Sequence, residues 1–381
     1  MKVLLAGGGT GGHTTPGIAL AQRIVEDGSQ VLFLASNREV DVHLLQRCGY
    51  QAVHLATRRL SLNPLAWPGL CVDGVKVFQQ VRRIIDDFAP DVVVGLGGYV
   101  SLVPLVAARL RHVPIVLLEQ NVIPGKVTRW VAPFADEVEC QWQETIRHFG
   151  VNVRARVTGN PVRAELLAAT RDDAVRRMNL DPGRKTLLVA GGSQAAHALN
   201  VMMVQSAADI VREAPALQVI HLAGEADCGL VAAAYKQTGV DGRVVAFLDD
   251  IAAYRAADLA LGRAGGTTIA ELTACGVPCI LVPYPHATDD HQRHNARSLA
   301  ECGAAVVLEQ ADFTPRILAG IIRKFFGDEA LAKRMHQASL DRGRPAAAAD
   351  IAAKLRTLVR PAPKLVAAPD LNPEPVTKEQ S

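Results

Sequence analysis

Two short apolar runs, each ending in a cluster of glycines, constrain the fold of this chain more than any other feature. Residues 3–6 lead into three glycines at 7–9, and residues 187–190 lead into Gly-Gly-Ser at 191–193. An aliphatic run closed by glycine is typical of a buried parallel strand and the tight turn after it. The sequence therefore predicts two halves that open with the same strand and turn.

Apolar runs and amphipathic stretches alternate along both halves. Aromatic residues make up only 4% of the chain, so the cores must consist mainly of Val, Leu, Ile and Ala, which suits strands covered by helices on both faces. Such alternation predicts an α/β fold with doubly wound parallel sheets. Strands are expected at 3–6, 31–35, 92–95, 115–118, 187–190, 219–222, 259–261, 279–282 and 305–308, and helices at 17–26, 74–88 and 351–359.

At 381 residues the chain is long enough for two domains. We expect two Rossmann-like domains that face a cleft and join near Gly159-Asn160-Pro161. The N-terminal domain would span residues 1–160 and the C-terminal domain residues 161–345, followed by a closing helix at 346–360. Residues 361–381 are rich in proline and lack apolar periodicity, which predicts a disordered tail.

The net charge of +3 is too small for a typical nucleic-acid-binding domain, and it suits a site for anionic phosphates or a weak attraction to an anionic membrane. The seven cysteines form no C-x-x-C pair and are expected to be reduced thiols in the cytosol. The uncharged stretch 92–108 is too short for a membrane span and contains glycines and a proline, so it predicts a strand, a turn and a helix start. With no signal peptide expected, the protein should be soluble or peripheral.

The first glycine loop, residues 7–13, can bring backbone N–H groups close to an anion. It contains the spacing G-x-G-x-x-G, but a dinucleotide site also needs an acidic residue at the end of the second strand, and residues 34–37 (Leu-Ala-Ser-Asn) offer none. Pro16 is favoured as a first helical residue, so the helix is expected to begin near it. His13 would then lie in the loop and face the cleft.

A second candidate site follows the strand at 259–261. Arg263 and Ala264 lead into a helix start with Gly266, Thr267 and Thr268, which can hold a diphosphate. Glu271, one turn further on, could accept hydrogen bonds from both hydroxyls of a ribose. Alternatively, Glu271 could be a capping carboxylate of an ordinary helix start.

A third polar segment, residues 286–294, contains three histidines and two aspartates. His291 and His294 could share one helix face as metal ligands. No further metal-binding pattern completes the set, so contact with a sugar is the preferred interpretation. No metal and no cofactor are expected.

Taken together, ordered segments between residues 3 and 310 resemble the MurG family, the N-acetylglucosamine transferases of peptidoglycan synthesis with the GT-B fold. In the order of that family, the matching segments are Gly8-Gly9-Thr10-Gly11-Gly12-His13 with Pro16, Gly97-Gly98-Tyr99-Val100-Ser101, Glu119-Gln120-Asn121, Gly159-Asn160-Pro161-Val162-Arg163, Gly191-Gly192-Ser193-Gln194, Phe247-Leu248-Asp249-Asp250, Arg263-Ala264-Gly265, Glu271, and His291-Gln292 with Asn295. The chain departs from the family pattern at Ala195, Ala264 and Gly266, each of which replaces another small residue.

The resemblance implies an inverting transfer of N-acetylglucosamine from UDP-N-acetylglucosamine to the 4-hydroxyl of undecaprenyl-pyrophosphoryl-N-acetylmuramoyl-pentapeptide. The substrate-binding residues that it implies are Thr10, Gly11, Gly12, Asn121, Arg163, Ser193, Leu248, Gly266, Thr267, Thr268, Glu271 and Gln292. Leu248 and Arg163 would lie near the uracil, and Glu271 would bind the ribose. Ser193 and residues 266–268 would bind the diphosphate.

The resemblance also implies that Gln292 and Asn121 contact the transferred sugar. The reaction needs a base for the acceptor hydroxyl, and His13 is the first candidate because imidazole titrates near neutral pH. Glu119 is the second candidate. Alternatively, His13 could be a ligand of the acceptor pyrophosphate, and Glu119 could be a structural carboxylate that holds its loop.

A lipid-linked acceptor would require the enzyme to reach the cytoplasmic face of the membrane as a peripheral protein. A surface of apolar residues beside basic ones can bind an anionic membrane. The candidate surface consists of Arg58, Arg59, Leu60, Leu62, Leu65, Trp67, Leu70, Lys76, Arg82 and Arg83. The alternative is a buried loop beside a core-facing helix. Rival functions are a UDP-sugar epimerase, which would act on the donor alone, and a non-catalytic nucleotide-binding module, which would never release UDP.

Overall fold

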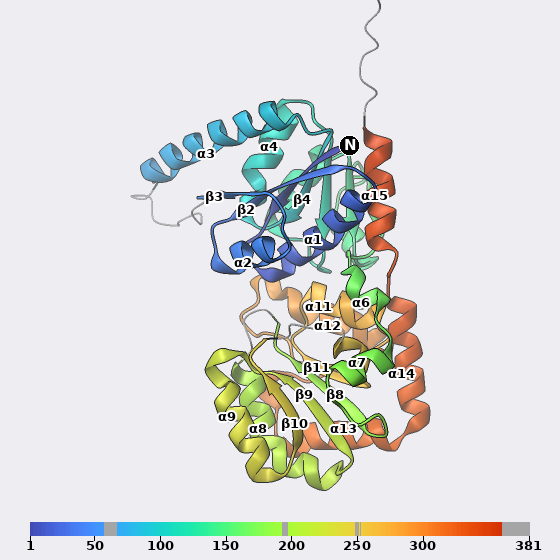
Figure 1. Ribbon diagram of the computed structural model, residues 1–381. Coiled ribbons are helices and arrows are strands. Elements are labelled where there is room, and N and C mark those ends of the chain that lie inside the picture. The colour runs from blue at the N-terminus through green and yellow to red at the C-terminus, as the bar shows by residue number, and fades with distance from the viewer. Residues whose placement is uncertain (57–66, 193–196, 248–250, 252, 360–381) are drawn as a thin grey trace, which may run out of the picture.

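The protein, described here by a computed structural model, consists of two lobes, each built on a parallel β-sheet, and Figure 1 shows one lobe above the other. The structure describes all residues except 57–66, 193–196, 248–250, 252 and 360–381, and the side chains of residues 67–73 are likewise not described. The predictions for Ser193, Leu248, the C-terminal tail and most of the proposed membrane segment therefore lie outside the described residues.

The sheet of the N-terminal lobe has seven parallel strands in the order β3-β2-β1-β4-β5-β6-β7. The strands are β1 Lys2–Gly7, β2 Gln30–Ser36, β3 Ala52–Leu55, β4 Val92–Gly97, β5 Ile115–Glu119, β6 Glu137–Cys140 and β7 Ala155–Val157.

The sheet of the C-terminal lobe has six parallel strands in the order β10-β9-β8-β11-β12-β13. The strands are β8 Lys185–Ala190, β9 Leu217–Leu222, β10 Asp241–Val245, β11 Leu259–Gly262, β12 Cys279–Leu281 and β13 Ala305–Val307. Two doubly wound parallel sheets confirm the predicted fold class.

Helices connect the strands and cover both faces of each sheet. They are α1 Gly11–Glu26, α2 Glu39–Arg47, α3 Trp67–Phe88, α4 Leu102–Leu110, α5 Lys126–Val131, α6 Ala164–Ala168, α7 Arg171–Arg177, α8 His197–Glu213, α9 Gly224–Thr238, α10 Ala253–Ala256, α11 Gly266–Ala274, α12 His291–Glu301, α13 Pro315–Gly327, α14 Glu329–Arg342 and α15 Ala347–Leu358, with short 3-10 turns such as η2 Tyr99–Ser101. None of the described helices is long and apolar enough to cross a membrane.

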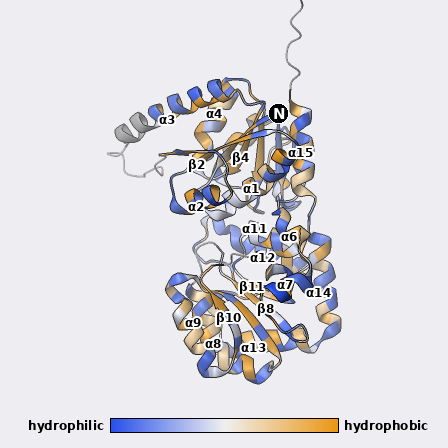
Figure 2. Cartoon of the chain, viewed as in Figure 1, coloured by the Kyte–Doolittle hydropathy of each residue, from blue (hydrophilic) through white to orange (hydrophobic). Residues whose placement is uncertain are grey.

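The central strands are buried on both faces, as their continuous apolar runs predict. All six residues of β4 and all five of β5 are buried. Figure 2 shows apolar strands inside both lobes and polar residues on the outer surfaces of the helices. The stretch 92–108, with its glycines, is β4, the turn η2 and the start of α4, as predicted.

The last helix returns to the N-terminal lobe. Ile351, Ala352 and Leu355 of α15 are fully buried in one cluster with Val3 and Leu5 of β1. Figure 1 shows α15 beside the upper lobe, whereas α14 lies beside the lower one. The core of the N-terminal lobe is therefore completed by residues from the end of the described chain.

Both sheets reverse their strand order at the equivalent place, between β1 and β4 in the first sheet and between β8 and β11 in the second. Ligands of open α/β sheets bind beyond the carboxyl ends of the strands at such a switch point. Glycine-bearing loops follow all four strands at these ends. The topology thus predicts a ligand-binding site between the loops of the two sheets.

Candidate active site

A cavity of about 580 Å³ opens between the lobes at this position. It is lined by Thr10, Gly12, His13, Gln120, Asn121, Gly191, Gly192, His197, Ala198, Arg263, Gly265, Gly266, Thr267, Thr268, Tyr284, Pro285, His286, His291, Gln292 and Gln310. Eight of the residues predicted from the sequence are among them, namely Thr10, Gly12, His13, Asn121, Gly266, Thr267, Thr268 and Gln292. The remaining described ones, Gly11, Glu119, Arg163 and Glu271, do not line it.

The first glycine loop is held by a carboxylate that sequence analysis did not single out. Asp41 of α2 is fully buried and accepts hydrogen bonds from the Gly9 N–H at 2.6 Å, the Thr14 hydroxyl at 2.5 Å and the Ser36 hydroxyl. A Cβ added at Gly8 would lie 2.6 Å from the same carboxylate, so the loop can approach it only as glycine. Both oxygens of Asp41 are therefore used to fix the loop.

The first helix begins earlier than the sequence indicated. It starts at Gly11, so the prediction of a start near Pro16 was wrong, and His13 lies in the first helical turn rather than in a loop. Pro16 has no N–H to bond the Gly12 carbonyl four residues before it. That carbonyl instead accepts the Thr267 hydroxyl of the other lobe at 2.7 Å. A proline is tolerated inside this helix because the carbonyl that it frees has another donor.

The His13 imidazole has its tautomer fixed by the backbone. Its Nδ1 lies 3.0 Å from the Leu96 carbonyl oxygen, which can only accept, so Nδ1 carries the hydrogen. The neutral ring then has its lone pair on Nε2. Burial lowers the pKa of His13, although the charges of Glu119 and Asp41 act in the opposite direction. A neutral imidazole with an available Nε2 is the state that a general base requires.

The Glu119 carboxylate is occupied by its own loop. Its Oε1 accepts the Asn121 N–H at 3.0 Å and the Asn121 amide at 3.2 Å, and its Oε2 accepts the Gly125 N–H at 2.9 Å. The side chain is buried at the end of β5 and does not line the cavity. This arrangement favours the structural alternative for Glu119 over the role of base.

The N-terminus of α11 approaches the N-terminal lobe very closely. A Cβ added at Gly266 would lie 2.2 Å from the Gln120 carbonyl oxygen, so this contact requires glycine. The Gly266 carbonyl accepts the Gln141 amide at 3.1 Å. The first N–H groups of a helix have no hydrogen-bond partner within that helix. Gly266, Thr267 and Thr268, the first residues of α11, line the cavity. Such a wall can bind the oxygens of a diphosphate.

Glu271 and Arg163 form an ion pair behind this wall. The Arg163 Nε and Nη2 donate to Glu271 Oε1 at 3.0 and 2.7 Å. Burial raises the pKa of Glu271, and the Arg163 guanidinium opposes the shift. The N-cap of α11 is Gly265, and the Glu271 carboxylate lies six residues further on and accepts from Arg163, which disfavours the alternative interpretation of a capping carboxylate. Its contact with a ribose stays a prediction.

Asn295 of α12 links the two lobes beside the cavity. It is fully buried, accepts the Val122 N–H at 2.9 Å, and donates to the Asn121 side-chain oxygen at 3.0 Å and the Ala264 carbonyl at 3.1 Å. One hydrogen of the Asn121 amide is held by Glu119, which leaves the other for a ligand. Asn295 thus positions a predicted sugar contact from the opposite lobe.

The histidines of the third polar segment do not form a metal site. Within the described part of the chain, no group of three or more His, Cys, Asp or Glu side chains could hold a metal ion. His291 Nδ1 lies 2.7 Å from the Thr288 carbonyl oxygen, and Gln292 accepts the Tyr284 N–H at 3.0 Å. His291 and Gln292 instead contribute to the cavity wall.

Comparisons with known proteins agree with this geometry. Residues 3–139 match the glycosyltransferase family 28 N-terminal domain, and residues 186–354 match the family 28 C-terminal domain. The fold resembles the crystal structure of MurG from Acinetobacter baumannii with a TM-score of 0.75, at 27% identity over 93% of this chain and 99% of that one. It also resembles a putative UDP-N-acetylglucosamine 2-epimerase from Listeria monocytogenes with a TM-score of 0.67, but at 15% identity this likeness concerns the fold alone.

Curated relatives distinguish between the transferase and the epimerase. The chain is 39% identical to a protein from Geobacter metallireducens, over 94% of this chain and 99% of that one. It is 37% identical to a protein from Pelobacter propionicus, again over 94% and 99%. Both carry the name UDP-N-acetylglucosamine–N-acetylmuramyl-(pentapeptide) pyrophosphoryl-undecaprenol N-acetylglucosamine transferase. The chain therefore belongs to the MurG family of N-acetylglucosamine transferases, as the order of its motifs predicted.

Proposed function

We propose that this protein transfers N-acetylglucosamine from UDP-N-acetylglucosamine to the 4-hydroxyl of undecaprenyl-pyrophosphoryl-N-acetylmuramoyl-pentapeptide, with inversion at the anomeric carbon. The observation that carries the proposal is the composition of the cavity wall, which has hydrogen-bond donors and a cation but no carboxylate in the part that the structure describes. Its described residues include four histidines and Arg263 but no carboxylate, and they lie around the N-terminus of α11. Cationic and N–H-donating groups without acids suit an anionic diphosphate on both the donor and the departing UDP.

His13 is the proposed base. Its Nε2 would take the proton of the acceptor hydroxyl as that oxygen attacks the anomeric carbon and the bond to the β-phosphate breaks. Residues 266–268 would bind the diphosphate, with Ser193 beside them, and Leu248 and Arg163 would hold the uracil. Gln292 and Asn121 would contact the sugar.

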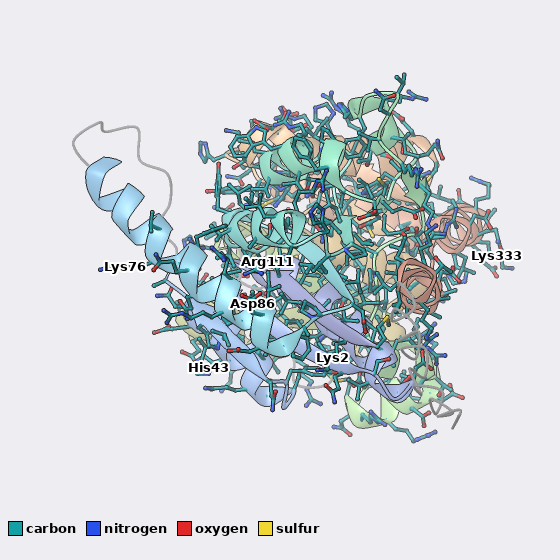
Figure 3. All side chains as sticks on the ribbon, turned by 90° about the horizontal axis from the view of Figure 1, so that it is seen from above. Lys2, His43, Lys76, Asp86, Arg111 and Lys333 are labelled. Carbon is teal, nitrogen blue, oxygen red and sulfur yellow. The ribbon has the colours of Figure 1, made fainter. Side chains whose placement is uncertain are left out.

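Peripheral contact with the membrane at its cytoplasmic face is proposed through α3. In the described part of that helix, Val77, Val81 and Ile85 are buried while Lys76, Arg82 and Arg83 are exposed. Figure 3 shows Lys76 on the portion of α3 that projects from the body, with Lys333 on the other side of the view. A cationic projecting helix is attracted to anionic lipid.

The membrane contact is tested by sedimentation with vesicles of phosphatidylglycerol and phosphatidylcholine. Replacing Lys76, Arg82 and Arg83 together by glutamate should release the protein from anionic vesicles. Exposed cations of the C-terminal lobe, such as Arg316 and Lys324 of α13, provide the matched control. Equal release by both sets of substitutions would contradict a specific role of α3.

The transfer itself is tested by coupled detection of UDP release with and without the lipid-linked muramoyl acceptor. A transferase should release UDP at a rate that depends on the acceptor, with a disaccharide-linked lipid as the second product. An epimerase would interconvert the donor sugar without acceptor, and that result would overturn the proposal. A non-catalytic module would bind the donor and release nothing.

A further inference from the structure

A histidine that no motif singled out stands in the cavity wall at the start of α8. His197 is the first residue of that helix, and its side chain is 72% exposed. Its Nδ1 lies 2.8 Å from Oδ2 of Asp227, in the first turn of α9. A carboxylate can only accept, so Nδ1 carries a hydrogen. The Nε2 atom has no hydrogen-bond partner among the described residues and remains available to a ligand.

The Asp227 carboxylate is fixed by a chain of hydrogen bonds from the core. His221 is fully buried, its Nε2 lies 3.0 Å from the Asn200 side-chain oxygen, and its Nδ1 lies 2.8 Å from the Tyr235 hydroxyl. The Asn200 amide uses both hydrogens, on the Ala223 carbonyl at 2.8 Å and on Asp227 at 2.7 Å.

Only one arrangement of hydrogens satisfies this chain. Because the Asn200 oxygen accepts, His221 carries its hydrogen on Nε2, and the Tyr235 hydroxyl donates to Nδ1. Burial lowers the pKa of His221 to about 4, so this ring stays neutral and the arrangement persists across physiological pH. Tyr235, His221 and Asn200 then donate in turn, and Asp227 accepts from Asn200 on one side and from His197 on the other.

One carboxylate contacts His197. Asp227 is the carboxylate in contact with it, and hydrogen bonds from Asn200 and His197 lower the pKa of Asp227. The other ionisable groups of the cavity wall are His13, Arg263, Tyr284, His286 and His291. From α13, Arg323 pairs with Glu213 at the opposite end of α8. A carboxylate bonded to one ring nitrogen stabilises the positive charge of an imidazolium.

We propose that His197 is a further catalytic residue, whose imidazolium Nε2–H donates to an oxygen of the departing β-phosphate, with Asp227 as its positioning residue. As the bond from the anomeric carbon to the phosphate oxygen breaks, its electron pair remains on that oxygen and UDP gains a negative charge. The acceptor oxygen forms the new bond, and its proton goes to the base. His197, which belongs to the C-terminal lobe, stabilises the new negative charge by donating its Nε2–H to the phosphate oxygen. This inference rests on the proposed transfer reaction.

A purely structural role would make the pair of His197 and Asp227 a link between α8 and α9. That role needs a hydrogen bond and not a charge, so stability would change but the pH dependence of turnover would not. A charged role has the opposite signature. A hydrogen bond from a charged His197 strengthens as the diphosphate gains charge in the transition state. Loss of this bond should therefore change the turnover number more than the Michaelis constant for the donor.

The test uses His197→Gln, His197→Arg and Asp227→Asn, with His336→Gln as control, because His336 is exposed on α14 and does not line the cavity. The turnover number is measured with saturating donor and acceptor from about pH 6 to about pH 8.5, where histidine titrates. His197→Gln should lower it about tenfold near neutral pH, the lower end for a hydrogen bond to a charged group, because the side chain is exposed.

The pH profile separates the two roles. A charge on His197 that acts on the diphosphate predicts that wild-type turnover falls toward alkaline pH. The charge of His197→Arg does not depend on pH in this range, so this variant should keep most of the activity and lose the fall. Asp227→Asn retains a hydrogen-bond acceptor without charge, so it should move the fall to lower pH. The His336→Gln control should follow the wild type.

Two results would overturn the inference. One is a His197→Gln enzyme with wild-type turnover at every pH. The other is an equal, pH-independent loss in the Gln and Arg variants, which would assign His197 to the structure alone. Neither result would touch the proposed transfer, because acceptor-dependent UDP release by the wild-type protein is measured independently. Thermal unfolding of each variant shows whether it is folded.

Discussion

Replacing either partner of the ion pair between Arg163 and Glu271 should have unequal effects, because the two side chains differ in burial. The Glu271 side chain is 5% exposed and that of Arg163 33%. After Glu271→Gln, the guanidinium can turn toward water. After Arg163→Met, the carboxylate remains buried without a counter-charge. We therefore expect Arg163→Met to lower the free energy of unfolding more than Glu271→Gln.

The size of the difference follows from the geometry. Removing one partner of a buried ion pair costs about 3–5 kcal/mol. For Arg163→Met we expect about 3 kcal/mol, at the lower end of that range, because water reaches one third of the arginine side chain. For Glu271→Gln we expect about 1 kcal/mol, because the amide oxygen still accepts one hydrogen bond from the guanidinium.

The cost of Arg163→Met should also depend on pH. Burial already raises the pKa of Glu271, and loss of the guanidinium raises it further. A carboxyl whose pKa is higher in the folded than in the unfolded state loses stability as pH rises, from its unfolded value of about 4.3 up to its folded value. Relative to the wild type, the variant should therefore lose more stability at about pH 8 than at about pH 5.

Urea unfolding followed by circular dichroism at about pH 5 and about pH 8 measures both effects. The control is Lys333→Met, which removes a solvent-exposed pair with Glu329 and should leave the free energy of unfolding unchanged at either pH. Equal costs for Arg163→Met and Glu271→Gln, unchanged between the two pH values, would refute a buried carboxylate charge. Donor affinity of Glu271→Gln, measured in parallel, tests the predicted ribose contact.

Three further predictions concern the first glycine loop and its contact with the start of α11. His13→Ala should lower the turnover number by about 10²–10⁴-fold while donor affinity stays unchanged, and His13→Asn should be nearly as slow. Turnover is measured by UDP release, and its recovery in the Asn variant would make His13 a phosphate ligand. Thr267→Val should cost about 1 kcal/mol in urea unfolding, because the Gly12 carbonyl loses its donor; an unchanged midpoint would show that water replaces the hydroxyl. Asp41→Ala should cost about 3 kcal/mol, because it leaves the Gly9 N–H and two hydroxyls without their buried acceptor; a proteolysis rate of the loop equal to that of the wild type would contradict this.

Strands that are continuous aliphatic runs could be predicted from the sequence, and short strands with polar residues could not. Strands such as β4 and β8 are continuous aliphatic runs, and the predicted ranges fall within or close to the observed bounds. By contrast, β7 (Ala-Arg-Val) and β10 (Asp-Gly-Arg-Val-Val) are short, polar and partly exposed, so no apolar run marks them. The start of α1 was missed because the partner that compensates for Pro16 comes from residue 267, which no local pattern reveals.

The candidate site could be predicted where chemistry depends on local motifs. Glycine loops and the start of α11 were found, since their spacing alone indicates an anion site. Asp41 was missed because an acidic residue in the first turn of a helix is common for its favourable interaction with the helix dipole. His197 was missed because its partner, Asp227, lies thirty residues away and only the fold brings the two together. Side-chain pairs across elements carry no signal in a single sequence.

The lobes meet through two kinds of contact. Val122 and Trp142 from the N-terminal half are buried within the apolar cluster of the C-terminal lobe, and the Arg342 guanidinium lies 5.0 Å from the centre of the Trp142 ring. Beside the cavity, the lobes meet through hydrogen bonds, such as the one from Thr267 to Gly12. Apolar contacts resist separation because they would expose surface to water, whereas hydrogen bonds can be exchanged for bonds to water or to a ligand at little net cost. We expect a diphosphate that binds Thr267 to accept its hydroxyl in place of the Gly12 carbonyl, which then bonds to water, while the apolar contacts keep the lobes together.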